Sequence, residues 1–179
     1  MRRGHIHDNT RPAQFLVDNI DLLPRGRVFD IAMGSGRNAV FLAQKGFQVE
    51  GVDISPEAVN KALELSQESK AHISAQVADL EDNYLLVENQ YDVVICFYYL
   101  HRPLIPQIKR SLKPGGMVVY ETYIVDQARW GQPKNPDHLL KHNELLEIFR
   151  DWRCLRYREG IIGEQKAIAS IIAQKSSRR

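Results

Sequence analysis

The sequence predicts an α/β domain with a mostly parallel β-sheet, and three observations support this. Short apolar runs alternate with amphipathic stretches along almost the whole chain, the pattern of strands separated by helices. The chain is 44% hydrophobic and 26% charged, as is usual for globular proteins. Its 179 residues are enough for one domain, which we place at residues 1–174 with a tail of residues 175–179.

Seven segments have the apolar, β-branched character of strands. The fourth, Tyr91–Phe97, is apolar through its centre, as expected of a strand that is buried on both faces. The predicted strands span residues 28–32, 47–53, 72–78, 91–97, 117–122, 152–159 and 167–173.

Helices are predicted between these strands. Ser55 followed by Pro56 is typical of a helix start, because serine caps the first turn and proline fits the first helical position. Three further helices are predicted from apolar stripes. The first, in an N-terminal covering segment (residues 1–26), has Phe15, Leu16, Ile20 and Leu23. The second has Leu104, Ile108 and Leu112, and the third, which follows Asn143, has Leu145, Leu146 and Phe149.

Residues 123–141 interrupt this alternation. The segment contains Gly131, Pro133 and Pro136 and shows little periodicity. Connections of this length are uncommon inside compact domains unless they form a lid or a binding loop. We therefore expect this loop to form part of an acceptor site.

Composition argues against several classes of protein. The net charge of +2 is too small for a general nucleic-acid binder, and no apolar run reaches the roughly 18 residues that cross a bilayer. The first residues lack the apolar run of a secretory signal, so we expect a cytoplasmic protein. Cys96 and Cys154 are predicted to be buried free thiols, and no Cys/His cluster has zinc spacing, so no metal is predicted.

A glycine-rich turn follows the first predicted strand. Gly34 and Gly36 let the backbone take positive φ and let a ligand approach closely. The next helix then offers its unpaired N–H groups to an anionic part of that ligand. Gly34-x-Gly36-x-x-Ala39 matches the dinucleotide fingerprint, but a match to this short pattern alone is weak.

Three carboxylates favour a different ligand. Asp30, Asp53 and Asp79 come at the ends of the first three predicted strands, at the edge where open α/β sheets bind ligands. Asp30 would repel a pyrophosphate and attract an ammonium or sulfonium group. Asp53 is placed for ribose hydroxyls and Asp79 for an adenine amine. The three acids therefore favour a positively charged adenosyl cofactor over a dinucleotide.

The ordered motifs resemble those of the class I S-adenosylmethionine-dependent methyltransferases over residues 11–173. The motifs are Asp30-x-Ala32-x-Gly34-x-Gly36, Asp53, Ala78-Asp79-Leu80, Tyr91-Asp92 and Leu112-Lys-Pro-Gly115-Gly116. The resemblance implies a Rossmann-like, seven-stranded, mostly parallel sheet with helices on both faces and a C-terminal antiparallel hairpin. Ala32 stands where the family usually has glycine, so we expect a negative φ there.

Gly34-Ser-Gly36-Arg37-Asn38 and Arg11 are most similar to the tellurite-resistance methyltransferases. That subfamily carries a His/Arg-bearing excursion before its last strand, whereas residues 160–166 contain neither residue type. The resemblance therefore extends to the cofactor, S-adenosylmethionine, and not to tellurite.

The resemblance also implies roles for individual residues. The backbone of Ala32, Gly34 and Gly36 would line the methionine part, and Asp30 would hold the loop or meet the α-ammonium group through water. Asp53 would bind the ribose hydroxyls, and Ile54 would pack on the face of the adenine. Asp79 would accept from the adenine amine, and the Leu80 N–H would donate to a ring nitrogen. The Phe97 carbonyl would face the α-ammonium group. Arg37 and Arg11 are candidates for the methionine carboxylate, or are simply exposed.

The acceptor pocket is expected beyond the fourth and fifth strands. His101 is either a general base or a hydrogen-bond donor at a helix start, and a base is needed only if the acceptor must lose a proton. Tyr98, Tyr123 and Trp130 would form an aromatic wall or pack in the core. Arg102, Arg129 and Lys134 would bind an acidic acceptor or be solvated. Arg150, Arg153, Arg156 and Arg158 are expected to form a solvated edge.

We therefore predict methylation of a small molecule, with S-adenosylmethionine as the cofactor. The accepting group (thiol, chalcogen oxyanion, amine or carboxylate) stays open. The alternatives are an RNA or protein methyltransferase and a non-catalytic protein that binds the cofactor. We expect a monomer or homodimer without nucleic-acid or membrane partners.

Overall fold

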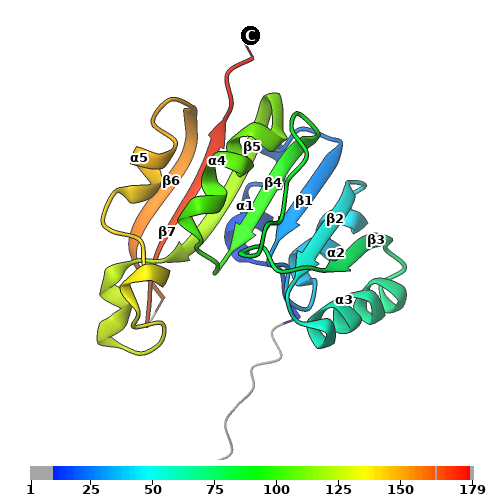
Figure 1. Ribbon diagram of the computed structural model, residues 1–179, viewed down its shortest axis with the longest axis horizontal. Helices are drawn as coiled ribbons and strands as arrows, with labels where there is room; N and C mark the ends of the chain where they lie inside the picture. The colour runs from blue at the N-terminus through cyan, green and yellow to red at the C-terminus, as the bar shows by residue number, and fades with distance from the viewer. Residues whose placement is uncertain (1–9, 164, 178–179) are drawn as a thin grey trace, which may run out of the picture.

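A seven-stranded sheet organises the computed structural model, which describes residues 10–163 and 165–177. The strand order is β3-β2-β1-β4-β5-β7-β6 (Figure 1). The first nine residues of the predicted covering segment and the last two of the predicted tail lie outside the described residues.

All seven predicted strands are present. The first five are parallel, and β7 pairs antiparallel with both β5 and β6, which confirms the predicted C-terminal hairpin. Leu112 was wrongly expected on a helix, because it begins β5. The strands are β1 (Arg27–Ile31), β2 (Gln48–Asp53), β3 (Ile73–Val77), β4 (Tyr91–Phe97), β5 (Leu112–Tyr123), β6 (Arg153–Ile162) and β7 (Lys166–Gln174).

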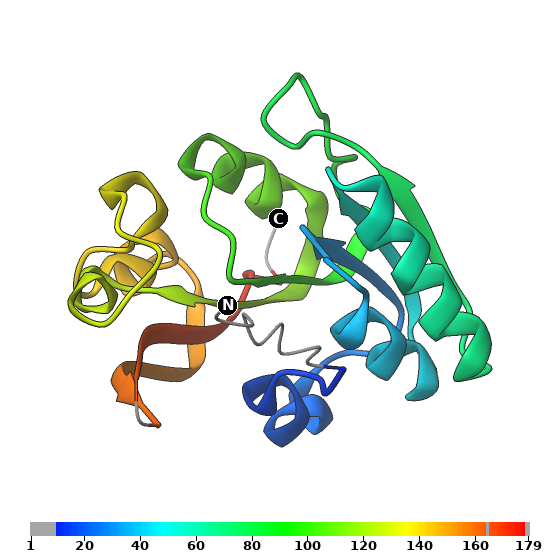
Figure 2. The same cartoon turned by 90° about the horizontal axis from the view of Figure 1, so that it is seen from below.

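Helices cover both faces of the sheet (Figure 2). On one face α1, α2 and α3 pack on the strands, and on the other face α4 and α5 do so. The α-helices are α1 (Gln14–Asp18), α2 (Arg37–Gln44), α3 (Pro56–Glu68), α4 (Ile105–Ser111) and α5 (Glu144–Ile148), and the short 3-10 helices are η1 (Ile20–Leu22), η2 (Arg102–Leu104), η3 (Val125–Arg129) and η4 (Pro136–His138).

Local sequence explains where α3 begins. The Ser55 hydroxyl accepts a hydrogen bond from the Ala58 N–H at 3.2 Å, and Pro56 occupies the first helical position. Asn143 stands at the corresponding position before α5, but its side chain makes no capping hydrogen bond. Since a cap contributes about 1 kcal/mol, packing of the buried Leu145 and Phe149 must hold α5 in place.

Strand order reverses between β1 and β4, because β2 and β3 lie on one side of β1 and the later strands on the other. Ligands of open α/β sheets bind at such a reversal, beyond the carboxyl ends of the strands. Residues 123–141 lie next to this edge and contain η3 and η4. Backbone hydrogen bonds from Val125 to Leu140 and from Leu140 to Tyr123, both 2.9 Å, join the two ends of this loop.

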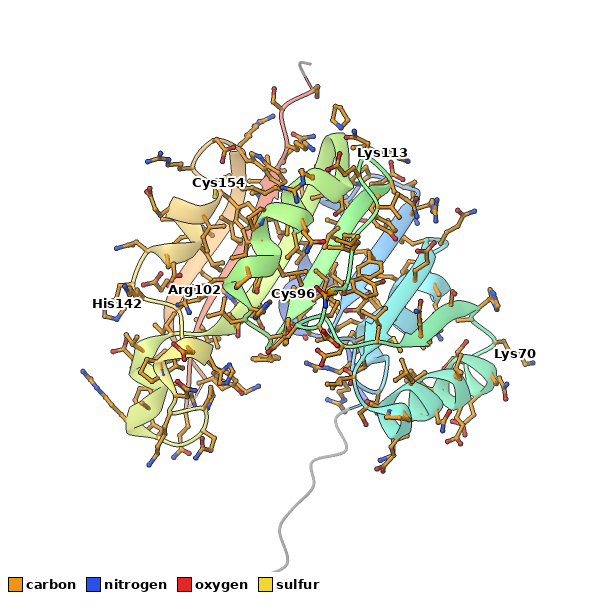
Figure 3. All side chains as sticks on the ribbon, in the orientation of Figure 1. Lys70, Cys96, Arg102, Lys113, His142 and Cys154 are labelled. Atoms are coloured by element: carbon orange, nitrogen blue, oxygen red, sulfur yellow. The ribbon has the colours of Figure 1, made fainter. Side chains whose placement is uncertain are left out.

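The two cysteines differ in environment. Cys96 lies in the middle of the sheet, fully buried, as predicted, but Cys154 is exposed on the edge strand β6 (Figure 3). The prediction of burial was wrong for Cys154, because an outermost strand has only one neighbour to cover it. Within the described part of the chain, no helix is long and apolar enough to cross a membrane, and no three His, Cys, Asp or Glu side chains are placed to hold a metal.

Candidate active site

The turn between β1 and α2 is built from residues with positive φ. Gly34 has φ +56° and Gly36, which precedes α2, has φ +80°. A Cβ atom on Gly36 would lie 2.7 Å from the Cβ of Ala62, whereas one on Gly34 would meet no atom within 4 Å. Gly36 is therefore required for the packing of α2 on α3, and Gly34 leaves open space above the turn.

Ala32 departs from our expectation. Its φ is +50°, not negative, although it carries a side chain. L-residues pay roughly 1–2 kcal/mol for this conformation. The next residue helps to fix it, since the Met33 N–H donates to the Val52 carbonyl at 2.9 Å. Ala32 thus adopts the positive φ that is usually found at glycine.

Asp53 organises the same turn. One carboxylate oxygen accepts from the Gly34 N–H at 2.8 Å and the other from the Ser55 N–H at 2.9 Å. The side chain therefore ties the end of β2 to the glycine turn and to the start of α3. Each oxygen keeps a second lone pair, so the predicted role in binding ribose hydroxyls is compatible with these contacts.

Asp30 is a buried acid with an incomplete set of partners. It is 2% exposed, and its Oδ2 atom has no hydrogen-bond partner. Burial raises the pKa of this carboxyl well above its usual range, and the nearby Arg37 acts in the opposite direction. A buried polar atom without a partner is costly, so the site favours a ligand or water that brings a donor or a positive charge.

A cavity of about 330 Å³ opens at this edge, which we call the sheet-edge cavity. Five of its lining residues were predicted to bind the cofactor, and Ile54, which is 64% exposed, offers a free apolar surface there. Ala78, Glu81 and Tyr99 were not predicted to bind it, although Glu81 follows the predicted Asp79 by two residues. The lining residues are Ala32, Asp53, Ile54, Ala78, Asp79, Leu80, Glu81 and Tyr99.

The remaining predicted cofactor residues lie around the turn instead. Arg37 donates to the Arg11 carbonyl at 3.0 Å, and its guanidinium carbon lies 5.9 Å from the centre of the Tyr98 ring. Phe97 is a buried residue at the end of β4. Arg37 therefore links the covering segment to α2, and its predicted contact with a carboxylate stays a prediction.

Two further cavities lie between the end of β4 and residues 123–141. The first loop cavity has a volume of about 450 Å³ and the second of about 390 Å³. The first is lined by Tyr98, Tyr99, Leu100, Thr122, Tyr123, Gln132, Pro133 and His138. The second is lined by Glu81, Leu100, His101, Arg102, Pro103, Asn135, Asp137 and His138.

These cavities adjoin one another and the sheet-edge cavity. Leu100 and His138 line both loop cavities. Tyr99 and Glu81 each line the sheet-edge cavity and one loop cavity, and the Tyr99 hydroxyl donates to Glu81 at 3.3 Å. Of the predicted acceptor residues, Arg129, Trp130 and Lys134 line neither loop cavity. The role of their loop in an acceptor site stays a prediction. Gln132, Pro133 and His138 line the loop cavities but were not singled out from the sequence, because they bear no distinctive motif.

The guanidinium group of Arg102 is hydrogen-bonded to a carboxylate and to two backbone carbonyls. It donates to both carboxylate oxygens of Glu144, at 2.7 and 3.0 Å, and to the carbonyls of Asp137 and Leu139 at 3.0 and 2.9 Å. Burial alone would raise the pKa of Glu144, but the bonds from Arg102 and from the Lys141 backbone lower it. Arg102 thus holds the loop against α5, and four of its five N–H groups donate to protein atoms.

Glu121 is a buried carboxylate that holds Tyr98 in place. It is 3% exposed and accepts from the Tyr98 hydroxyl at 3.0 Å, from Ser170 at 2.6 Å and from Arg158 at 3.2 Å. Arg158 was expected to be solvated, and this was wrong, because it reaches across β7 to a buried carboxylate and contacts the Phe15 ring. No local pattern marks such a contact between strands that are far apart in the sequence.

The chain matches the family model described as a methyltransferase domain over residues 28–116. Three relatives are similar to it. Hemagglutinin 1 of Eikenella corrodens is 27% identical, over 87% of this chain and 53% of its own. The probable S-adenosyl-L-methionine-dependent methyltransferase TehB of Haemophilus influenzae is 25% identical, over 82% and 52%. The ubiquinone biosynthesis O-methyltransferase of Xanthomonas campestris is 33% identical, over 56% and 44%.

The crystal structure of Haemophilus influenzae TehB also superposes on this structure, with a TM-score of 0.78 and 21% identity over 92% of this chain and 62% of that one. This likeness concerns the fold. The chain spans about half the length of the first two curated relatives that it matches.

The family match, the sheet order and the acidic sheet edge together identify the class of protein: the chain belongs to the class I S-adenosylmethionine-dependent methyltransferases. Within that class it is related to TehB. The site fits the cofactor of the class, since Asp30 and Asp53 suit its positive charge and its ribose, and Ile54 and Leu80 offer apolar surface for a base.

Proposed function

We propose that this protein transfers a methyl group from S-adenosylmethionine to a small molecule bound in the loop cavities. One observation carries the proposal: Tyr99 and Glu81 line both the sheet-edge cavity and a loop cavity. Molecules bound on the two sides would contact the same side chains. Methyl transfer needs this proximity, since the reacting atoms must approach to ~3–3.5 Å.

When bound, S-adenosylmethionine supplies a methyl group that is activated by a positively charged sulfur. The protein's task is then to bind, to orient and to exclude water. Asp53 holds the glycine turn in shape, and the buried carboxyl group of Asp30, whose Oδ2 atom has no hydrogen-bond partner, favours a positive charge or a donor at the turn. Tyr98 and Tyr99 form the wall beyond β4 that keeps the acceptor in place.

The volumes of the loop cavities favour a small acceptor. Values of about 450 and 390 Å³ fall in the range of small-molecule sites, about 300–1,000 Å³. Arg102 connects the loop to Glu144 of α5, so the loop residues that line the cavities are held in place. The relative from Xanthomonas campestris, a ubiquinone biosynthesis O-methyltransferase, also supports a small acceptor. A cytoplasmic location and a monomer or homodimer stay predictions from the sequence.

A two-stage experiment tests the proposal. Calorimetry with S-adenosylhomocysteine measures cofactor binding, and the protein is then incubated with S-adenosylmethionine and a panel of thiols, phenols, amines, carboxylates, selenite and tellurite. We expect tight binding and release of S-adenosylhomocysteine with at least one acceptor. Binding without release across the panel would instead indicate a non-catalytic protein, and methylation of added RNA or protein alone would contradict a small acceptor.

A further inference from the structure

The first loop cavity is lined mainly by neutral side chains, with His138 as its one basic residue. Three of its eight lining residues are tyrosines, and none is Asp, Glu, Lys or Arg. Burial raises the pKa of Tyr98, Tyr99 and Tyr123, so their hydroxyls are neutral at physiological pH. Two cations, Arg37 and Lys166, lie over the Tyr98 ring, at 5.9 and 5.1 Å from its centre.

An anionic acceptor would find no Lys or Arg among the side chains that line this cavity, and burying a charge without a close partner is costly. Arg102, in the neighbouring second loop cavity, has its donors on Glu144 and on two backbone carbonyls. An oxyanion bound there would find only one further N–H of Arg102 unless it displaced these protein contacts. Aromatic walls instead suit a flat, neutral ring, which they contact face to edge or by offset stacking.

The second loop cavity holds a pair of groups suited to accept a proton. The Nδ1 atom of His101 lies 3.8 Å from the Oε1 atom of Glu81, and the same oxygen accepts from the Tyr99 hydroxyl. A carboxylate beside Nδ1 favours the tautomer with its proton on that nitrogen and leaves Nε2 as the acceptor. Arg102, Asp137 and His138 are the other titratable groups of this cavity.

The alternative role of His101 finds no support in the geometry. His101 does precede η2, but its side chain makes no capping hydrogen bond. Its side chain is 25% exposed, so it is open to a ligand in the cavity. Such a distance of 3.8 Å can shorten when substrate binds, as is common for catalytic pairs in ligand-free structures.

We propose, on the basis of the function proposed above, that the acceptor is a neutral aromatic alcohol, a phenol or a catechol, and that His101 takes its proton. The acceptor oxygen forms a bond to the methyl carbon while the carbon–sulfur bond breaks, and the electron pair of that bond stays on sulfur. The hydroxyl proton moves to Nε2 of His101 and then to water. Glu81 is a positioning residue that orients the imidazole.

The test compares two acceptors of different acidity, catechol and 4-nitrocatechol. With catechol, His101→Gln should lower kcat by about 10²–10⁴-fold, the usual contribution of a general base. With 4-nitrocatechol, at a pH where it is already ionised, the loss should be far smaller. Glu81→Gln should show the same dependence on the acceptor with a smaller loss. His72→Gln, on the opposite edge of the sheet, is the matched control and should leave kcat unchanged.

A second measurement does not depend on turnover. The visible absorbance of 4-nitrocatechol reports its ionisation when it binds to the protein loaded with S-adenosylhomocysteine. Wild type should bind it as the phenolate at a pH where the free compound is protonated, and His101→Gln should not. Calorimetry with S-adenosylhomocysteine shows that the variants are folded.

The outcomes separate this inference from the function on which it rests. Equal loss of kcat with both catechols would give His101 a structural role and overturn the inference. Methylation of selenite, tellurite, thiols, amines or carboxylates but not of any phenol would also overturn it and leave the proposed small-molecule methyltransferase intact. If no small acceptor in the panel led to release of S-adenosylhomocysteine, both the inference and the proposed function would be overturned.

Discussion

Replacing Gly36 by alanine should destabilise the protein far more than the same change at Gly34. At Gly36 the new Cβ would lie 2.7 Å from the Cβ and 3.1 Å from the Cα of Ala62, so α2 or α3 must shift. Overpacking of this kind costs about 1–3 kcal/mol, and the positive φ of +80° adds about 1–2 kcal/mol for an alanine. We therefore expect a loss of about 2–5 kcal/mol in the free energy of unfolding.

Gly34→Ala is the matched control, because φ there is also positive but the new Cβ meets no atom within 4 Å. It should lose only the backbone cost, about 1–2 kcal/mol. Urea unfolding measures both losses, and in a chain of this size each kcal/mol also lowers Tm by about 2–4 °C. If the two variants lost equal stability, contact with Ala62 would not be the reason for glycine at position 36.

Three other changes test the site. Asp53→Ala should weaken S-adenosylhomocysteine binding by about 1.5–3 kcal/mol, since hydrogen bonds to a charged group are lost; unchanged calorimetric affinity would contradict its assigned place. Burial raises the pKa of Asp30 in the folded state above its unfolded value, so the ligand-free protein should lose stability as pH rises through that interval. Asp30→Asn should remove this loss, so urea unfolding should show the variant to be more stable than wild type at neutral pH. The difference in the free energy of unfolding should shrink toward pH 3.8. A difference that did not depend on pH would refute the raised pKa of Asp30. Arg102→Ala should raise the KM of the acceptor and speed hydrogen exchange in residues 137–144 while leaving cofactor affinity unchanged; slow exchange there would show that other contacts hold the loop.

The sequence predicted the elements that depend on local pattern. The buried strand Tyr91–Phe97 has the same bounds in the structure as in the prediction, because a strand that is covered on both faces must be apolar through its centre. Ser55 and Pro56 marked the start of α3 for a reason confined to one helical turn. The acids at the strand ends were found because parallel strands bring their carboxyl ends to one edge.

What the sequence did not predict depends on contacts between distant segments. The partner of Arg158 follows from the antiparallel register of β5, β7 and β6, which aligns Glu121 with Ser170 and Ser170 with Arg158. The positive φ of Ala32 depends on the whole turn and on its neighbour β2, not on the alanine itself. Trp130 and Arg129 lie in the predicted loop, but only folding of η3 and η4 decides which of its residues face the cavities.

The position of β7 has a consequence for synthesis of the chain. Although β7 follows β6 in the sequence, it lies between β5 and β6 in the sheet. During translation the N-terminal five strands can assemble first, but β6 has no neighbour until residues 166–174 leave the ribosome. Until then β5 presents an open, apolar edge that invites pairing with other nascent chains, so a ribosome that stalls before β7 leaves an aggregation-prone intermediate.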